Sequence, residues 1–124
     1  MKNIYLTPIL LAIAALVGAC SSMSNNTSLL DQTRSEYRAA QGNPNVASYA
    51  TLEMKQAGEA LDQANLAASH NDSVEKVDKL AYLAKQKIAL AQEVAKQKAA
   101  EADVANAGKE RDQMRLDQRT NEAN

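Results

Sequence analysis

Apolar and small residues recur every three or four positions through the middle of the chain, which is the spacing of one face of an α-helix. The interval alternates regularly between four and three residues. The positions that follow this rhythm are Ala50, Met54, Ala57, Leu61, Ala64 and Ala68. The pattern predicts a helix over about residues 48–69, with a heptad seam of mostly small residues along one side.

A shorter helix is predicted before it, from a cap at Thr27 or Ser28 to about Gln41. One side of this segment carries Leu30, Thr33, Tyr37 and Ala40. Gly42 and Pro44 follow, and they stop or kink the helix because glycine commonly ends helices and proline cannot continue one.

A long third helix is predicted after a turn. Asp72, with Glu75 three residues later, is typical of the capping box that begins a helix. Its seam consists of Val74, Val77, Ala81, Ala84, Ile88, Ala91 and Ala95. Because no helix breaker occurs before Gly108, the pattern extends to about Arg119, a length of about 70 Å.

The lengths of the two halves predict an all-α fold, namely a long antiparallel alanine-rich helical hairpin with a kinked first arm. A fold back at Asn71 pairs residues whose numbers sum to about 143. Met54 then meets the neighbourhood of Ile88, and Tyr37 meets Asn106. The alternative is a three-helix bundle, in which the first helix packs on the other two and the end of the third protrudes.

Charge agrees with pairing of the second and third helices. Residues 50–70 carry three acidic residues and one lysine, a balance of −2. Residues 73–98 carry six lysines and three acidic residues, a balance of +3. An acidic arm beside a basic arm favours their association, although each exposed ion pair adds under about 1 kcal/mol.

The N-terminus has the order of a bacterial lipoprotein signal peptide. Lys2 is followed by a mostly apolar run of about fourteen residues, shorter than the roughly twenty that span a membrane. Gly18 and Ala19 then precede Cys20, the only cysteine, in an arrangement that looks like a lipobox. A thiol is the nucleophile that can accept a diacylglyceryl group. We expect cleavage between Ala19 and Cys20 and lipidation of Cys20; the alternatives are an ordinary cleaved signal and an uncleaved anchor.

This interpretation sets the domain organisation and the location. Ser21 after the cysteine, in place of aspartate, resembles Gram-negative lipoproteins of the outer membrane, with the body in the periplasm; the alternative is a Gram-positive surface lipoprotein. The expected segments are a lipoprotein signal peptide (1–19), a lipidated flexible linker (20–27), the helical hairpin domain (28–119) and a disordered tail (120–124).

Composition and motifs argue against an enzyme. The 124 residues are 45% hydrophobic but only 3% aromatic, so large side chains that could wall a deep pocket are few. His70 is the only histidine, and with Asp72 and Glu75 it forms a set typical of an exposed turn. The sequence has no HExxH, CxxC or phosphate-binding glycine loop. We expect no catalytic residue, no cofactor and no metal site.

Charge and exposed leucines define the expected partners. Without Lys2, 13 basic residues stand against 15 acidic ones and form no basic patch with aromatics, so nucleic acid is not expected. Two arms alone would leave Leu66, Leu80, Leu83 and Leu90 exposed, which predicts self-association or a protein partner. The membrane is contacted through the N-terminal lipid. No residue supports binding to peptidoglycan.

The stretch from Arg34 to Ala107 is similar to a family of small bacterial lipoproteins with an alanine-rich helical domain, known as domain of unknown function 4398. The resemblance is carried by Ser48, Tyr49, Ala50, Leu52, Ala57, Leu61, Ala64, Ala68, Ala81, Ala84, Ala91 and Ala95. In the family this domain often precedes an OmpA-like peptidoglycan-binding domain. The resemblance implies a helical fold and no activity, and wall attachment is not expected to be inherited from it.

Together these features predict a non-enzymatic, outer-membrane-anchored periplasmic lipoprotein whose helical domain is a spacer or protein-interaction module of the cell envelope. One alternative is a self-assembling structural protein that braces the membrane against the cell wall. Another is an accessory regulator of an envelope complex.

Overall fold

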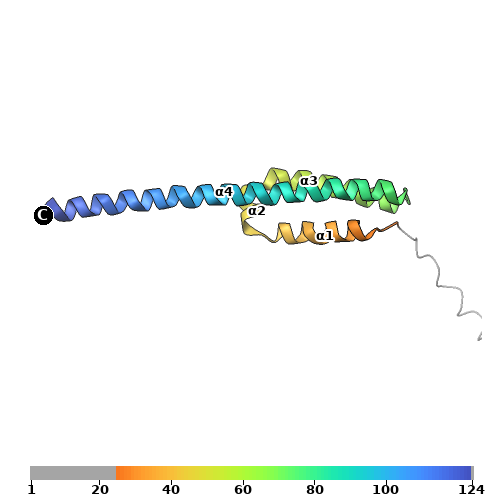
Figure 1. The fold of residues 1–124 in the computed structure, drawn as a ribbon, viewed down its shortest axis with the longest axis horizontal. Coiled ribbons are helices and arrows are strands. Elements are labelled where there is room, and N and C mark those ends of the chain that lie inside the picture. Colours follow the sequence, from red (N-terminus) through yellow and green to blue (C-terminus); the bar gives the residue numbers. More distant parts are fainter. Residues whose placement is uncertain (1–24, 124) are drawn as a thin grey trace, which may run out of the picture.

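The computed structural model describes residues 25–123, and this part of the chain contains four helices and no strand. The helices are α1 (Ser28–Gln41), α2 (Pro44–Tyr49), α3 (Thr51–Ser69) and α4 (Val74–Ala123), as Figure 1 shows. The predicted all-α class is therefore confirmed. The predicted signal peptide and Cys20 lie outside the described residues. None of the described helices is both long and apolar enough to cross a bilayer.

Both predicted ends of α1 are confirmed by its caps. The Thr27 hydroxyl accepts a hydrogen bond from the backbone N–H of Leu30 at 3.1 Å, which satisfies one of the free donors of the first turn. At the other end, the backbone N–H of Gly42 donates to the carbonyl of Arg38 at 3.2 Å. The helix α1 therefore begins and ends where its neighbouring capping residues predict.

The predicted helix over residues 48–69 is confirmed as α3 from Thr51 onward, whereas its first residues, Ser48 and Tyr49, belong to a separate short helix, α2. Asn43 caps α2 by accepting from the N–H of Asn45 at 2.9 Å, and Pro44 occupies the first turn, where its missing N–H costs nothing. Ala50, with φ −131° and ψ 36°, then interrupts the helical backbone. The Gly-Asn-Pro segment thus ends one helix and starts the next, whereas the sequence analysis interpreted it as a stop or a kink.

The predicted antiparallel pairing of α3 and α4 is confirmed. Asn71 occupies the left-handed region (φ 57°) in the connecting turn, a conformation that asparagine tolerates better than most residues. The cap of α4 is Ser73 rather than Asp72, because the Ser73 hydroxyl accepts from the N–H of Lys76 at 3.3 Å. The Asp72 carboxylate instead forms an ion pair with the Lys76 ammonium at 2.7 Å.

The prediction that α1 extends the hairpin is wrong. Thr33 Oγ1 lies 3.5 Å from the carbonyl oxygen of Ala81, and the Glu36 carboxylate lies 3.2 Å from Lys85 Nζ. These contacts join residues 48 and 49 positions apart, so α1 runs parallel to the first half of α4. Tyr37 is consequently far from Asn106, and the alternative, a three-helix arrangement with a protruding end of α4, describes the molecule.

Burial explains why α1 folds back. In this arrangement Leu30 is fully buried, Ala40 is 1% exposed, and Tyr37 packs against both groups of core residues. Pairing with the far half of α4 would have offered mainly alanine and charged residues, which bury less apolar area. The larger side chains of α1 therefore favour the groove between α3 and α4.

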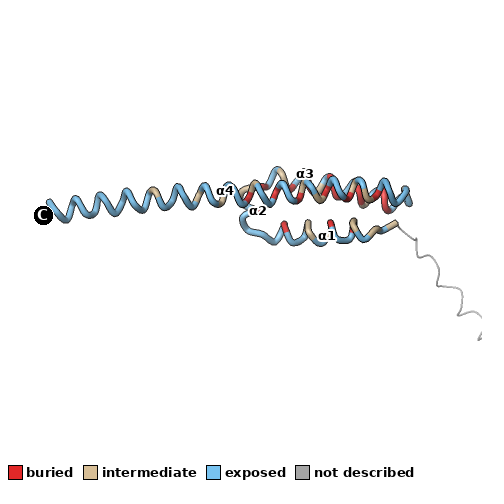
Figure 2. Tube along the Cα trace, in the orientation of Figure 1, coloured by how far each residue is buried: buried red, intermediate tan, exposed pale blue. Residues whose placement is uncertain are grey.

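The core consists mostly of alanine and forms two groups of buried residues along the bundle, both of which Tyr37 contacts. One end contains Leu30, Ala60, Leu61, Ala64, Ala67, Ala68, Val77, Ala81 and Ala84. The other end contains Ala40, Val46, Ala50, Met54, Ala57, Ile88, Ala91 and Ala95. Figure 2 shows the buried positions confined to the bundled half of the molecule. Small side chains let the helices approach closely but add little transfer energy per residue.

Ala95 is the last buried residue of α4, and the helix continues beyond it to Ala123. We call residues 96–123 the protruding arm; at 1.5 Å per residue it is about 42 Å long. Residues 120–123, predicted to be disordered, are helical here. The Thr120 hydroxyl donates to the carbonyl of Leu116 at 2.9 Å, and Gln118 donates to the Glu122 carboxylate at 3.2 Å. These local bonds within successive turns extend the helix past Arg119.

Candidate functional site

The chain enters the bundle at the turn between α3 and α4. The backbone N–H of Asn25 donates to the carbonyl of Ala68 at 3.2 Å, and its side-chain amide donates to the carbonyl of Asp72 at 2.9 Å. The last residues of the predicted flexible linker are therefore held, because they supply hydrogen bonds to carbonyls at the end of α3 and in the turn. We call this end of the molecule the turn pole; the protruding arm leaves from the opposite end (Figure 1).

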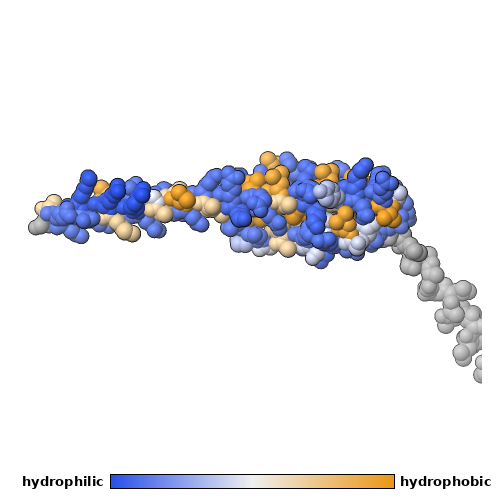
Figure 3. Space-filling view, viewed as in Figure 1, coloured by the Kyte–Doolittle hydropathy of each residue, from blue (hydrophilic) through white to orange (hydrophobic). Residues whose placement is uncertain are grey.

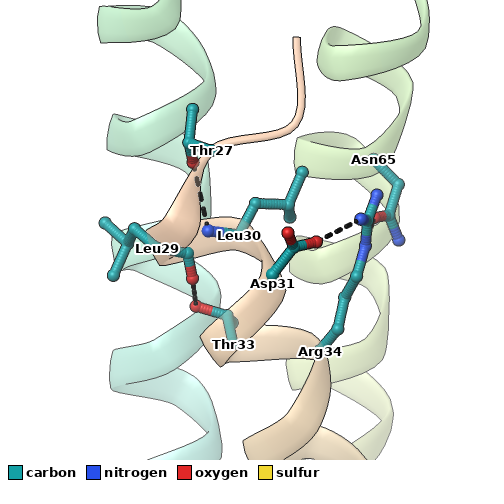
Figure 4. A network of polar contacts seen from close by, with 7 residues as sticks. All are labelled: Thr27, Leu29, Leu30, Asp31, Thr33, Arg34 and Asn65. Atoms are coloured by element: carbon teal, nitrogen blue, oxygen red, sulfur yellow. Dashed lines mark hydrogen bonds and ion pairs between the residues drawn. The ribbon is translucent and has the colours of Figure 1, made fainter. Parts of the chain in front are cut away.

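A polar network fixes α1 beside α3 (Figure 4). Arg34 bridges the two helices, since its Nε donates to Asn65 Oδ1 at 2.7 Å and its Nη1 contacts the Asp31 carboxylate at 2.9 Å. The Thr33 hydroxyl donates to the carbonyl of Leu29 at 2.7 Å, so a buried polar side chain is satisfied within its own helix. These groups position α1 and leave no free pair of reactive side chains.

His70 and its acidic neighbours do not assemble into a metal centre. His70 is the C-terminal cap of α3, where its backbone N–H donates to the carbonyl of Leu66 at 3.0 Å, and its side chain is exposed. Asp72 is paired with Lys76. Within residues 25–123, no group of three His, Cys, Asp or Glu side chains could hold a metal ion.

The hollows of the described surface are open grooves. One, of about 450 Å³, lies where α4 leaves the bundle and is lined by polar side chains that include Asn43, Asn45, Lys96 and Asp103. Another, of about 310 Å³, lies between α1, α2 and α3 and is lined by Tyr37 and Met54 among others. Neither of these two grooves places a hydroxyl or thiol nucleophile beside a histidine.

A leucine-rich face lies on the side of the α3–α4 pair away from α1. Ala81 and Lys85 face α1, and helical periodicity turns the α4 positions 80, 83, 87, 90 and 94 toward the opposite side. We call this surface the open face. It consists of Leu80, Leu83, Lys87, Leu90 and Val94 of α4 with Gln56 and Gln63 of α3; Ala60 and Ala67, which lie between α3 and α4 beneath this surface, are buried.

The open face leaves large apolar side chains in water. Leu83 is 46% exposed and Leu90 is 54% exposed, while Leu80, Lys87 and Val94 are half-buried. Figure 3 shows hydrophobic side chains gathered over the bundled half of the molecule. Isolated exposed leucines are ordinary, but a heptad-spaced row of them is typical of an interaction surface.

Three of the four leucines that the sequence analysis expected on exposed flanks meet on this face. Leu80, Leu83 and Leu90 lie together, whereas Leu66 points away from the α3–α4 groove by helical periodicity. The sequence could not show which groove α1 would cover. The signal that was available is the second heptad row in α4, in which each residue lies one position before a residue of the buried seam.

The protruding arm carries apolar residues without forming a row. Val104, Met114 and Leu116 are 74%, 67% and 58% exposed. Six basic and six acidic residues are spread among them, so the arm has no net charge. It is a bare mixed-charge helix with single apolar side chains.

The predicted site residues Ala19 and Cys20 lie outside the described residues, so signal cleavage and lipidation stay predictions. No curated protein and no solved structure matches this chain. A family model described as "Domain of unknown function (DUF4398)" matches residues 28–107, which include α1, α2, α3 and the bundled half of α4. The chain therefore belongs to the DUF4398 family.

Proposed function

We propose that this protein is an outer-membrane-anchored periplasmic lipoprotein whose helical body is a non-enzymatic spacer or protein-interaction module. The observation that carries the proposal is that the two ends of the molecule differ. The segment that contains Cys20 joins the body at the turn pole through Asn25, and the bare arm projects from the other end. A molecule attached at one end and free at the other suits a spacer between two envelope components.

The distances agree with this role. Five residue steps separate Cys20 from Asn25, and a fully extended chain spans at most about 18 Å over them. The turn pole would thus lie close to the membrane surface. The α4 helix, at 1.5 Å per residue, extends about 75 Å from that pole.

Lipid attachment rests on the sequence of the first twenty residues. Several acyl chains on Cys20 would anchor the protein firmly, because each buried CH₂ contributes about 0.8 kcal/mol. The Ser21 that follows it supports retention in the outer membrane.

The anchor is tested with variants at the first two positions of the expected mature chain. Cys20→Ser should abolish labelling by radioactive palmitate and leave the precursor uncut, whereas Ser21→Ala should keep both labelling and location. Ser21→Asp should keep the label and move the protein to the inner membrane. Persistent labelling of Cys20→Ser in fractionated cells would contradict the proposal.

The interaction role is tested from the protruding arm. A photo-reactive residue in place of Val104 or Leu116, both exposed, should crosslink to a defined envelope component in intact cells. The same group at Ser35, exposed on α1, is the control. Equal patterns from the arm and from Ser35 would contradict a role specific to the arm.

Self-assembly is the second candidate, and the open face favours it. A monomer keeps a row of leucines in water, and burial against another surface would stabilise the folded chain by mass action.

A further inference from the structure

We propose that the outer part of the protruding arm docks a helix of a partner protein that carries a row of carboxylates, and that Arg111, Arg115 and Arg119 bind this row. The proposal specifies the partner chemistry for the interaction role proposed above, and it rests on that role. The three arginines are exposed and lie four residues apart. They therefore follow one side of α4, with a rise of about 6 Å from each to the next. We call them the arginine row.

The arm has no net charge, but its charges are separated by side. Asp103, Glu110 and Asp117 lie seven residues apart, and seven residues are nearly two full turns, so these acids follow a second line along the helix. Glu110 and Arg115, at the middle of the two lines, lie about 140° apart around the helix axis. One side of the outer arm is therefore basic and another side is acidic.

The arginine row has no partner within its own helix. Arg111 has no acidic residue three or four positions away on either side. Asp112 lies three residues before Arg115, but the two side chains are not paired. Within residues 25–123, none of the three guanidinium groups forms an ion pair or a side-chain hydrogen bond. Their donors are thus available to an anion from outside the chain.

The arginine row also destabilises the arm in the absence of a partner. Like charges four residues apart on a helix repel each other. Two carboxylates that could offset this repulsion accept hydrogen bonds from glutamines, since Gln113 donates to Asp117 at 3.0 Å and Gln118 donates to Glu122 at 3.2 Å. A bound anionic partner would remove the repulsion, so the free energy that the row costs the free arm would favour the complex.

The type of basic residue indicates carboxylate as the ligand. Up to Lys109, α4 has seven lysines and no arginine, whereas beyond Lys109 it has three arginines and no lysine. A guanidinium group binds a carboxylate through two parallel hydrogen bonds, while an ammonium group acts as a point charge. The change from lysine to arginine therefore favours an oriented, paired contact at this end of the molecule.

Spacing and surroundings favour a helix as the bearer of these carboxylates. Acidic residues four positions apart on a partner helix repeat at the same rise as the arginine row, about 6 Å. Apolar side chains line shallow grooves beside the row, with Val104 next to Arg111 and Leu116 next to Arg115. Gly108 lets a partner backbone come close, since nothing lies within 4 Å of a Cβ built on it. An amphipathic acidic helix would cover Val104 and Leu116 as well, which a phosphate group alone would not.

Site-specific crosslinking in intact cells tests the site with the full-length protein. Gln118 and Gln113 are both exposed, and each donates to a carboxylate one turn later. Helical periodicity places Gln118 beside the arginine row and Gln113 on the other side of the arm. A photo-reactive residue in place of Gln118 should crosslink to a protein, at a helix whose acidic residues lie four positions apart. The same group in place of Gln113 should give much less of this product.

Double variants test whether the arginines make the contact. Arg111→Gln with Arg115→Gln should lower the crosslink yield from position 118 about tenfold, because two charge-assisted pairs are lost. Lys96→Gln with Lys109→Gln removes the same charge from the same arm and should leave the yield nearly unchanged. Arg111→Lys with Arg115→Lys keeps the charge but loses the parallel hydrogen bonds, so it should give an intermediate loss.

Amide hydrogen exchange distinguishes binding from a structural role of the arginines. Arg111→Gln with Arg115→Gln removes like-charge repulsion from the free arm, so exchange around residues 111–119 should slow by about twofold while the crosslink is lost. Faster exchange in this variant would mean that the arginines stabilise the helix, and it would overturn the proposal.

The other outcomes that would overturn the proposal concern the crosslinked product. They are no product from position 118, a product that is a lipid or a glycan, equal products from positions 118 and 113, and equal losses in the arginine and lysine double variants. If Val104 and Leu116 crosslink to an envelope component while the arginine variants have no effect, the arginine row fails and the proposed function stands. If palmitate labelling is absent but the product from position 118 depends on the arginines, only the anchor fails.

Discussion

Tyr37 shows how a single large side chain decides the position of a helix. Its ring packs against both ends of the core, and its hydroxyl oxygen lies over Gly58 of α3. A Cβ added at Gly58 would come within 2.6 Å of that oxygen and 3.3 Å of the ring carbon Cζ. Gly58 is therefore a packing residue, although its sequence context looks like that of any glycine inside a helix.

Gly58→Ala should lower the free energy of unfolding by about 1 kcal/mol. Overpacking against Tyr37 costs more than the gain of about 1 kcal/mol that alanine brings to a helix interior. Urea unfolding followed by circular dichroism measures the difference. In a Tyr37→Phe background the closest atom is gone, and Gly58→Ala should there be neutral or stabilising; an equal loss in both backgrounds would contradict the contact.

Asp78 is a residue whose burial has no evident compensation. One of its carboxylate oxygens is buried without a hydrogen-bond partner among the described residues. Asp78→Ala should raise the free energy of unfolding by about 1 kcal/mol, because it removes an unsatisfied buried acceptor and improves helix propensity. Asp62→Ala, at an exposed position of α3, is the matched control and should give only the smaller propensity gain. Equal gains at the two positions would exclude a burial effect.

At the scale of the element, α4 is one continuous helix with two different environments. Its first half contributes six buried residues to the core, and its second half contributes none. At its start the protruding arm contacts α2, since Lys98 Nζ donates to the carbonyl of Tyr49 at 3.1 Å. Beyond that contact it is held by its own backbone hydrogen bonds and by side-chain pairs such as Gln113 with Asp117. A helix without tertiary contacts opens more readily than a packed one.

Gly108 is the weakest point of that arm, and nothing lies within 4 Å of a Cβ built on it. Gly108→Ala should stabilise the local helix by about 1 kcal/mol and slow amide hydrogen exchange around residues 104–112 by about fivefold. Exchange in α3 should not change, since the bundle ends at Ala95. Unchanged exchange in the arm would indicate that it is held by contacts other than its own helix.

The helices themselves were largely predictable from the sequence, because their signals are local. The Thr27 cap, the end at Gln41 and the turn after α3 depend on residues within a few positions of one another. The break in the helix at Ala50 could not be predicted, since no glycine or proline occurs at that position. It depends on α2 starting early at Pro44 and on Val46 and Ala50 both being buried against α4, which only the tertiary fold determines.

At the scale of the whole molecule, the sequence left two arrangements open, and the long hairpin was the wrong one. Heptad spacing indicates that a helix has an apolar side, but it does not indicate which other helix packs on that side. Alanine seams are especially permissive, because many registers pair small residues with small residues. The larger side chains of α1 favour the three-helix arrangement, in which α1 covers one side of the α3–α4 pair. The open face is the other side of that pair. Most of the candidate surface therefore could not be predicted from the sequence, because it depends on how the helices pack.

A distance measurement distinguishes the two arrangements in solution. Arg38 and Gln113 are both exposed, and spin labels on cysteines at these positions report the separation of α1 from the arm. In the observed fold Arg38 lies near the height of residue 86, so the labels should be about 40 Å apart along the axis. The hairpin would place them within about 12 Å along the axis. A single short distance by pulsed electron resonance, with Cys20→Ser as background, would contradict the three-helix arrangement.

The parallel course of α1 and α4 determines how the body would carry mechanical load. A pull between the membrane and something held by the protruding arm would act on the first residue of α1 in one direction and on the last of α4 in the other. The two helices would then be drawn past each other lengthwise. The contacts between them, such as Thr33 with Ala81 and Glu36 with Lys85, would share the strain at once instead of breaking one by one.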